Sequence, residues 1–226
     1  MKTFIRLIGL FVILCVISTN AQQQRFEGKI TYNIINSFGN LKYDYLISYN
    51  NFKTSQQGIK DFFLYDSVKA TSFFNKSKKF IQQRIDNLSG TLKDIYTSTY
   101  NDREKELKDG LLPETKKILG YNCNKIITTF DNGDTKYTTE SWVISDKTAK
   151  MSTQFDLITG TINDYFVHGY IPLLIIITND NGEQTERYEA TKIKEQKISN
   201  STFNFPKGYT EEVETLPDEY YDEEEY

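Results

Sequence analysis

The sequence predicts a mainly β protein built around a single antiparallel sheet, with few and short helices. Apolar and polar residues alternate with a period of two in several segments. The 226 residues include 16 Tyr and 15 Phe but only 4 Pro, and aromatic residues favour strands. Tight-turn sequences join pairs of the alternating segments. So many strands call for a sheet that is twisted and curled or closed, because open edges invite aggregation.

The first segment, residues 1–21, has the features of a secretory signal peptide. Lys2 and Arg6 precede an apolar run over residues 7–17, which is too short for a comfortable membrane span. Small residues follow, and cleavage is expected after Ala21. An uncleaved anchor helix is the alternative. We therefore expect an exported protein, periplasmic or extracellular, with no transmembrane span after cleavage.

The next segment, residues 22–209, is expected to form one β-rich domain. Residues 26–34 and 41–49 alternate like half-buried strands, and the turn chemistry of residues 36–40 joins them into an antiparallel hairpin. Further short strands are expected at residues 51–56, 62–65, 70–75, 79–86 and 91–99.

The middle of the chain contains one expected helix and the clearest hairpin. Residues 101–112 are rich in Glu and Lys, with Gly110 and Pro113 closing the segment, which suits a short surface helix. Residues 123–130 and 136–144 are β-branched and aromatic, and an Asn-Gly turn between them predicts a second hairpin.

A third hairpin is expected from residues 171–178 and 183–193, joined by another Asn-Gly turn. Pro172 should begin its strand, where a missing donor does least harm. Residues 173–177 are apolar at every position. Such a strand is either covered on both faces or lines an apolar cavity on one of them.

The last segment, residues 210–226, is an acidic tail with nine acids and no bases, and we expect it to be disordered. A solubilising terminus is the simplest interpretation; folding back on a basic patch or collecting divalent cations is the alternative. The net charge of the chain is −4. The leader carries +2 and the tail −9, so residues 22–209 carry +3.

Catalytic and metal-binding motifs are hard to find. His168 is the single histidine, and Cys123 is the single cysteine after the leader, in a strand-like segment where a buried side chain is the simplest interpretation. One His and one Cys cannot supply a zinc site, and neither Asn-Gly turn has the spacing of a calcium loop. We therefore expect no enzyme, no metal and no cofactor. Lysines interleave with aromatics near residue 80, but export and the acidic tail argue against nucleic acid as a partner.

Several motifs carry a resemblance to a family. They are KKILGYNCNK at residues 116–125, ESWVI at 140–144, GYIPL at 169–173, YEATKI at 188–193 and FNFPKGY at 203–209. The chain resembles a group of exported bacterial domains of unknown function that includes the GLPGLI proteins and is similar in layout to the periplasmic proteins LolA and LppX. The resemblance implies a curved antiparallel half-barrel with an apolar concave face and small helices as a lid. It implies no catalytic residue.

Two functional classes stay open. The first is a binding protein of the cell envelope that shelters a lipid or other apolar ligand on the concave face. The second is a structural or interaction protein that docks an envelope partner through a sheet edge or the acidic tail. For the first class, the expected ligand-binding side chains are aromatic or aliphatic: Tyr32, Tyr45, Phe74, Trp142, Leu174 and Ile176.

Overall fold

The computed structural model describes residues 24–48, 51–66, 69–84, 90–131, 133–151 and 160–212. The expected signal peptide and residues 213–226 of the expected tail lie outside these ranges. No helix in the described ranges is both long and apolar enough to cross a membrane.

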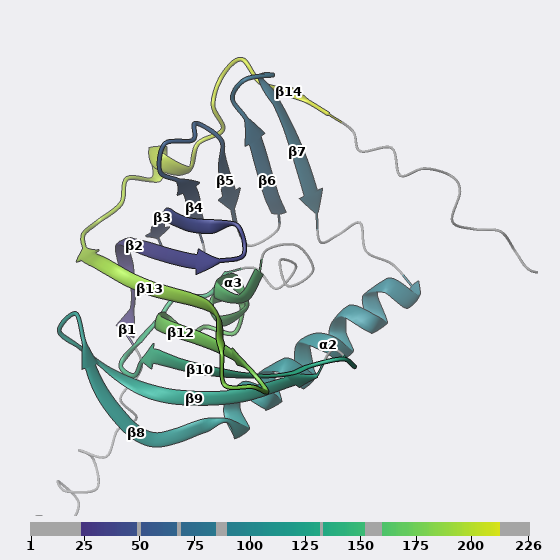
Figure 1. Cartoon of the computed structure of the whole chain (residues 1–226). Coiled ribbons are helices and arrows are strands. Elements are labelled where there is room, and N and C mark those ends of the chain that lie inside the picture. The colour runs from purple at the N-terminus through teal and green to yellow at the C-terminus, as the bar shows by residue number, and fades with distance from the viewer. Residues whose placement is uncertain are drawn as a thin grey trace, which may run out of the picture.

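Twelve strands of the described chain form one curved sheet, which confirms the predicted fold class (Figure 1). The strand order is β14-β7-β6-β5-β4-β3-β2-β13-β12-β10-β9-β8. Every neighbouring pair is antiparallel except β14 and β7. The strands are β2 (Glu27–Asn36), β3 (Gly39–Ser48), β4 (Asn51–Gln56), β5 (Phe62–Tyr65), β6 (Lys69–Phe74), β7 (Lys79–Arg84), β8 (Leu111–Ile118), β9 (Tyr121–Asp131), β10 (Lys136–Ile144), β12 (Pro172–Asn179), β13 (Gln184–Glu195) and β14 (Thr210–Glu211). Two short strands, β1 (Gln24–Arg25) and β11 (Lys147–Thr148), pair in parallel apart from this sheet.

The main core lies between the sheet and helix α3 (Gly160–Val167), which sits inside the curve (Figure 1). Phe166 of α3 stacks on Tyr45 of β3 and meets Phe52 of β4 edge to face. Tyr165 of α3 is fully buried, and its hydroxyl lies 2.5 Å from Ser141 Oγ of β10. We call the sheet face that meets α3 the inner face and the opposite one the outer face. The helix therefore fills the part of the inner face formed by β2 to β4.

Helix α2 (Gly90–Asp109) is longer than the sequence predicts. The helix expected at residues 101–112 is present up to Asp109, just before Gly110, but residues 111–112 begin β8, and the strand expected at residues 91–99 is wrong. That segment has three Thr, Ile95 and Tyr96, residue types that favour a strand locally. Its apolar positions, however, continue the three- and four-residue spacing of Tyr100, Arg103 and Leu107, and Leu107 is fully buried.

The three expected hairpins are present, and Pro172 begins β12 as predicted. Strand β8 was missed, because its charged residues leave no apolar alternation to detect. It forms one edge of the sheet, and its register with β9 shifts between Leu112 and Thr115, around Pro113. A bulge at this position accommodates a residue without an N–H donor.

A second, smaller core lies on the outer face of β5, β6 and β7. Leu64, Phe73 and Phe80 form it, and residues 200–212 run across it as a C-terminal strap. Phe205 of the strap packs 4.8 Å from Phe73 and 4.6 Å from Phe80, measured between ring centroids. The strap ends in β14, so the first two residues assigned to the acidic tail belong to the sheet.

Candidate functional site: a cavity beneath helix α2

A cavity of about 560 Å³ opens between α2 and the inner face of β9, β10, β12 and β13. We call it the α2 cavity. Its lining mixes hydroxyls, charged groups and a few apolar side chains. The lining residues are Ser37, Arg103, Glu106, Thr128, Thr129, Phe130, Tyr137, Thr139, Asp164, Ile177, Thr185 and Glu186.

The cavity exists because small side chains replace large ones along two strands. Thr128 of β9 pairs across the ladder with Thr139 of β10, and Thr139 also pairs with Ile177 of β12. Two residues along β10, the inner-face position is Ser141, which Tyr165 of α3 covers. The part of β10 that α3 covers ends at Ser141. The same strands therefore present a filled half and an open half of the inner face.

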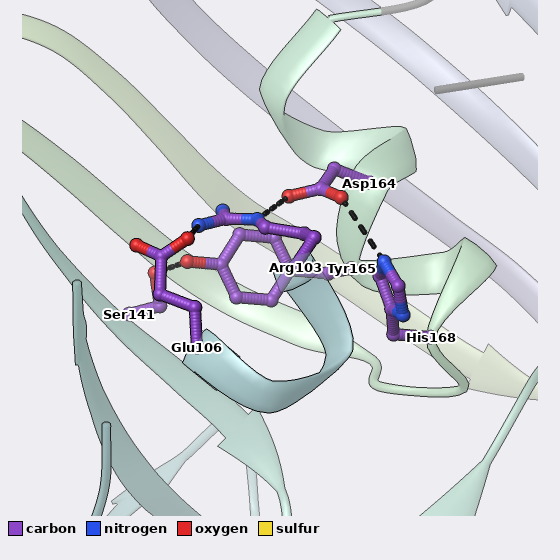
Figure 2. A network of polar contacts seen from close by, with 6 residues as sticks. All are labelled: Arg103, Glu106, Ser141, Asp164, Tyr165 and His168. Atoms are coloured by element: carbon purple, nitrogen blue, oxygen red, sulfur yellow. Dashed lines mark hydrogen bonds and ion pairs between the residues drawn. The ribbon is translucent and has the colours of Figure 1, made fainter. Parts of the chain in front are cut away.

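An ion-pair network joins α2 to α3 at the wall of this cavity (Figure 2). Arg103 Nε donates to Asp164 Oδ2 at 2.5 Å, and one Nη donates to Glu106 Oε2 at 2.7 Å. The guanidinium also lies 5.9 Å from the ring centroid of Tyr165. Figure 2 shows Arg103 reaching from α2 between the two carboxylates, with Tyr165 beside it. The network ties α2 to the core at its middle.

Protonation states within this network are firmly set. Burial lowers the pKa of Arg103, but the charge of Asp164 and the hydrogen bond to Glu106 outweigh it, so the pKa is raised overall. Burial raises the pKa of Tyr165 to about 12. Arg103 is therefore a cation and Tyr165 a neutral phenol near pH 7, and neither is poised to exchange a proton.

The end of α2 is anchored independently of Arg103. The Ile127 N–H of β9 donates to the Gly110 carbonyl at 3.0 Å, and Leu107 is buried in the main core. A Cβ atom at position 110 would lie 2.2 Å from the Ile127 carbonyl oxygen, so only glycine allows this close approach. Helix α2 is thus attached at two points: at its end, by Gly110, and further along, by the ion pairs of Arg103.

The six ligand-binding residues expected from the sequence do not meet at one place, and none lines the α2 cavity. Tyr32 and Tyr45 lie together on the inner face, where Tyr32 Oη donates to the Pro172 carbonyl and Tyr45 Oη to Asn163 Oδ1. Trp142 and Leu174 pair across the ladder on the outer face, since their neighbour Ser141 faces α3. Ile176 shares that outer face, and Phe74 lies at the end of β6. Their role in ligand binding stays a prediction.

His168 and Cys123 have separate surroundings, and neither lines the α2 cavity. His168 stacks on Tyr100 of α2, and its Nε2 lies 3.5 Å from Asp164 Oδ1. Cys123 is fully buried, as the sequence predicts, and its Sγ lies 3.7 Å from the Tyr121 carbonyl. Burial raises the Cys123 pKa to about 11, which suppresses the nucleophilic thiolate. Within the described ranges, no group of three or more His, Cys, Asp or Glu is placed to hold a metal ion.

Sequence reasoning missed the residues that do line the cavity. Arg103 and Glu106 are three residues apart on a charged helix, a spacing that signals an ion pair. Asp164, however, lies 61 positions from Arg103 and has no local motif. The cavity threonines resemble ordinary strand residues, so their grouping becomes visible only once the strands are in register.

Comparison with known protein families identifies the family of this chain. The model of DUF4412, a domain of unknown function, matches residues 26–209. The chain belongs to the DUF4412 family. This confirms the resemblance to a family of unknown function that the sequence motifs predict. Sequence comparison with curated proteins finds no match.

Solved structures with a similar course of the chain come from several bacteria. An uncharacterized conserved protein from Thermus thermophilus aligns with TM-score 0.49 and 7% identity, over 84% of this chain and 91% of that one. MucB in its complex with MucA from Pseudomonas aeruginosa aligns with TM-score 0.49 and 11% identity, over 82% of this chain. A putative outer membrane lipoprotein-sorting protein domain from Vibrio parahaemolyticus aligns with TM-score 0.30 and 9% identity, over 78% of this chain and 88% of that one. This chain spans only 57% of the MucB chain.

The motifs behind the DUF4412 resemblance have structural roles in this chain. Gly120 has a φ of +90° in the turn between β8 and β9, which favours glycine. The FNFPKGY segment supplies the strap, and the family match ends at Tyr209, whose ring meets Phe73 edge to face. These motifs maintain the scaffold, and the cavity residues lie outside them.

Proposed function

We propose that this DUF4412 protein is an exported, non-enzymatic binding protein of the cell envelope that holds a small amphipathic ligand in the α2 cavity. One observation carries the proposal: about 560 Å³ of space beside a curved sheet whose inner face at β3 and β4 is filled by its own helix. Ligand pockets commonly enclose roughly 300 to 1,000 Å³. The apolar side chains Phe130, Tyr137 and Ile177 would contact the ligand body, and threonine hydroxyls would orient it.

This proposal narrows the apolar ligand expected from the sequence. Tyr45 and Phe52 contact Phe166 of α3, so the most aromatic part of the inner face is already occupied. The space that remains has hydroxyl and carboxylate groups in its walls. A ligand with polar groups would satisfy them, whereas a bare hydrocarbon would leave them desolvated.

The structure of the sheet edge favours the cavity over docking through strand addition. The β8 edge carries Pro113, a register shift and the charged residues Lys116 and Lys117. These features are typical of edges that resist pairing with another strand. Docking through the acidic tail stays a prediction from the sequence.

A matched pair of substitutions on β12 tests the proposal. Ile177 lines the cavity, and its neighbour Ile176 points to the outer face; both are partly buried. We expect Ile177→Trp to fill the cavity and to weaken binding of the neutral fluorescent probe N-phenyl-1-naphthylamine at least about tenfold, a change of ~1.4 kcal/mol. Ile176→Trp should leave binding unchanged.

The measurement is a fluorescence titration of the chain without residues 1–21, with the melting temperature of each variant as the folding control. Native mass spectrometry of the same samples reports any co-purified ligand. A probe that fails to bind the parent chain, together with the absence of a co-purified ligand, would contradict the proposal. Loss of binding in Ile176→Trp but not in Ile177→Trp would move the site to the outer face.

A further inference from the structure

The charges around the α2 cavity are unbalanced. Among the described residues, one base and three acids line it: Arg103, Glu106, Asp164 and Glu186. A second cavity next to it, about 510 Å³, shares Glu106, Thr128 and Thr129 and adds Asp102 and Asp109 against Lys105. The α2 region is thus acidic, although residues 22–209 as a whole carry +3. Such a local field favours cations and repels anions.

The single base in the lining is not available as an anion clamp. Arg103 gives its Nε and one Nη to two carboxylates, and these pairs fix the guanidinium in the wall. An incoming phosphate or carboxylate would compete with Asp164 and Glu106 and would also face Glu186. The cavity therefore lacks the free, convergent donors that anion recognition needs.

Two largely buried threonines in the cavity have hydroxyls that can still form hydrogen bonds. Thr128 and Thr139 are 5% and 8% exposed, and neither hydroxyl bonds to any other described residue. Hydroxyl oxygens can accept from an N–H donor. Both residues line the cavity, so their hydroxyls are open to a polar ligand group or to water there.

Aromatic rings complete the lining. Phe130 and Tyr137 are cross-strand partners whose ring centroids lie 6.4 Å apart at an interplanar angle of 26°. Phe130 is 61% exposed, so its ring is accessible from solvent. Aromatic rings offer a large apolar contact surface for a ligand body, and their faces also attract a nearby cation.

We propose that the α2 cavity binds an organic cation, an ammonium or guanidinium group carried on an apolar body. The proposal rests on the proposed function, since it names the ligand class for the same cavity. The cationic group pairs with Glu186, whose carboxylate oxygens accept hydrogen bonds from its N–H groups. The hydroxyls of Thr139 and Thr128 lie two and three strands away in the same row and accept from further polar groups of the ligand. The apolar body contacts Ile177 and the Phe130–Tyr137 pair.

Three probes with the same eight-carbon tail separate the ligand class from binding itself. Octylammonium, octanol and octanoate are titrated into the chain without residues 1–21 by isothermal calorimetry at pH 7 and low salt. Octylammonium should bind at least about tenfold more tightly than octanoate, with octanol between them. Nα-acetyl-lysine amide, whose side-chain ammonium is free, is a fourth probe. If it binds more tightly than octylammonium, the cation belongs to a peptide side chain; if it binds more weakly, the cation is a free amine.

The matched variants are Glu186→Gln in the cavity and Glu183→Gln in the same hairpin outside the lining. Glu186→Gln should weaken octylammonium binding about fivefold, and Glu183→Gln should change it little. If none of the probes binds, the proposed function fails. Octanoate binding as tightly as octylammonium overturns the cation assignment alone, and so does an equal effect of both variants.

Discussion

At the scale of single residues, Cys123 shows how burial removes chemistry from a reactive group. The thiol is fully buried at the start of β9, and burial raises its pKa to about 11. Below pH 9 the thiol is protonated in both the folded and the unfolded chain, so the stability gained by burying a neutral thiol is fully present. As the pH rises from 9 through 11, the unfolded thiol ionises first, and this contribution is lost.

We expect the native chain to resist thiol reagents. At pH 8 the Cys123 thiol should react with Ellman's reagent at least about a hundredfold more slowly in the folded chain than in guanidinium, since attack needs an exposed thiolate. Stopped-flow absorbance traces with and without denaturant measure the ratio. Rapid labelling of the folded chain would show that the start of β9 opens or that Cys123 is accessible.

At the scale of elements, α2 approaches β9 closely at Gly110 and Ile127, which line the second cavity and are neighbours of Thr128 in the α2 cavity. Gly110 has an ordinary negative φ, so alanine there is conformationally allowed, but the added methyl group meets the Ile127 carbonyl and, less closely, the Glu106 carbonyl oxygen. Gly110→Ala should therefore cost about 1 to 3 kcal/mol of unfolding free energy. It should also weaken probe binding, because the end of α2 must move away from β9.

Chemical denaturation of Gly110→Ala checks the expected loss. Lys108→Ala is the control: it removes an exposed ion pair with Glu104, which solvent screens and which should contribute little to stability. Equal stability of the two variants would mean that the docking of α2 at Ile127 is loose.

Elements with a local signal could be predicted, and elements that depend on distant contacts could not. The third hairpin follows from Gly182 and its neighbours, because the turn needs a positive φ and it follows the continuous apolar run of residues 173–177. Residues 91–99 have strand-like composition, and the same helix continues to Tyr100, which stacks on His168, and to Leu107, which is buried in the core. The cavity could not be predicted, because its wall depends on the ion pair between Arg103 and Asp164, which joins two helices far apart in sequence.

At the scale of the whole molecule, the sheet has two cores on opposite faces. The inner core depends on α3, and the outer one depends on the C-terminal strap. The strap also pairs with the sheet edge, because the Thr210 N–H donates to the Lys78 carbonyl and Lys79 pairs with Glu212 at 2.6 Å. The sequence motif FNFPKGY predicted a family resemblance, but the packing partners of its aromatic rings required the fold.

Two truncations separate the strap from the acidic tail. A chain ending at Ser199 exposes Phe73 and Phe80 and should lose at least about 3 kcal/mol of stability. A chain ending at Glu212 keeps the strap and should melt within a few degrees of the full chain. Thermal unfolding by circular dichroism measures both, and equal melting temperatures for the two truncations would contradict the role of the strap.

The central claim is that the α2 cavity is the binding site. The most direct test is a titration of the ¹⁵N-labelled chain without residues 1–21 with octylammonium and, separately, with octanol, followed by amide chemical shifts. The account expects saturable shifts that are largest at Thr128, Thr139, Ile177 and Thr185, around the cavity. Largest shifts at Trp142 and Leu174 on the outer face, or no saturable shift with either probe, would contradict it.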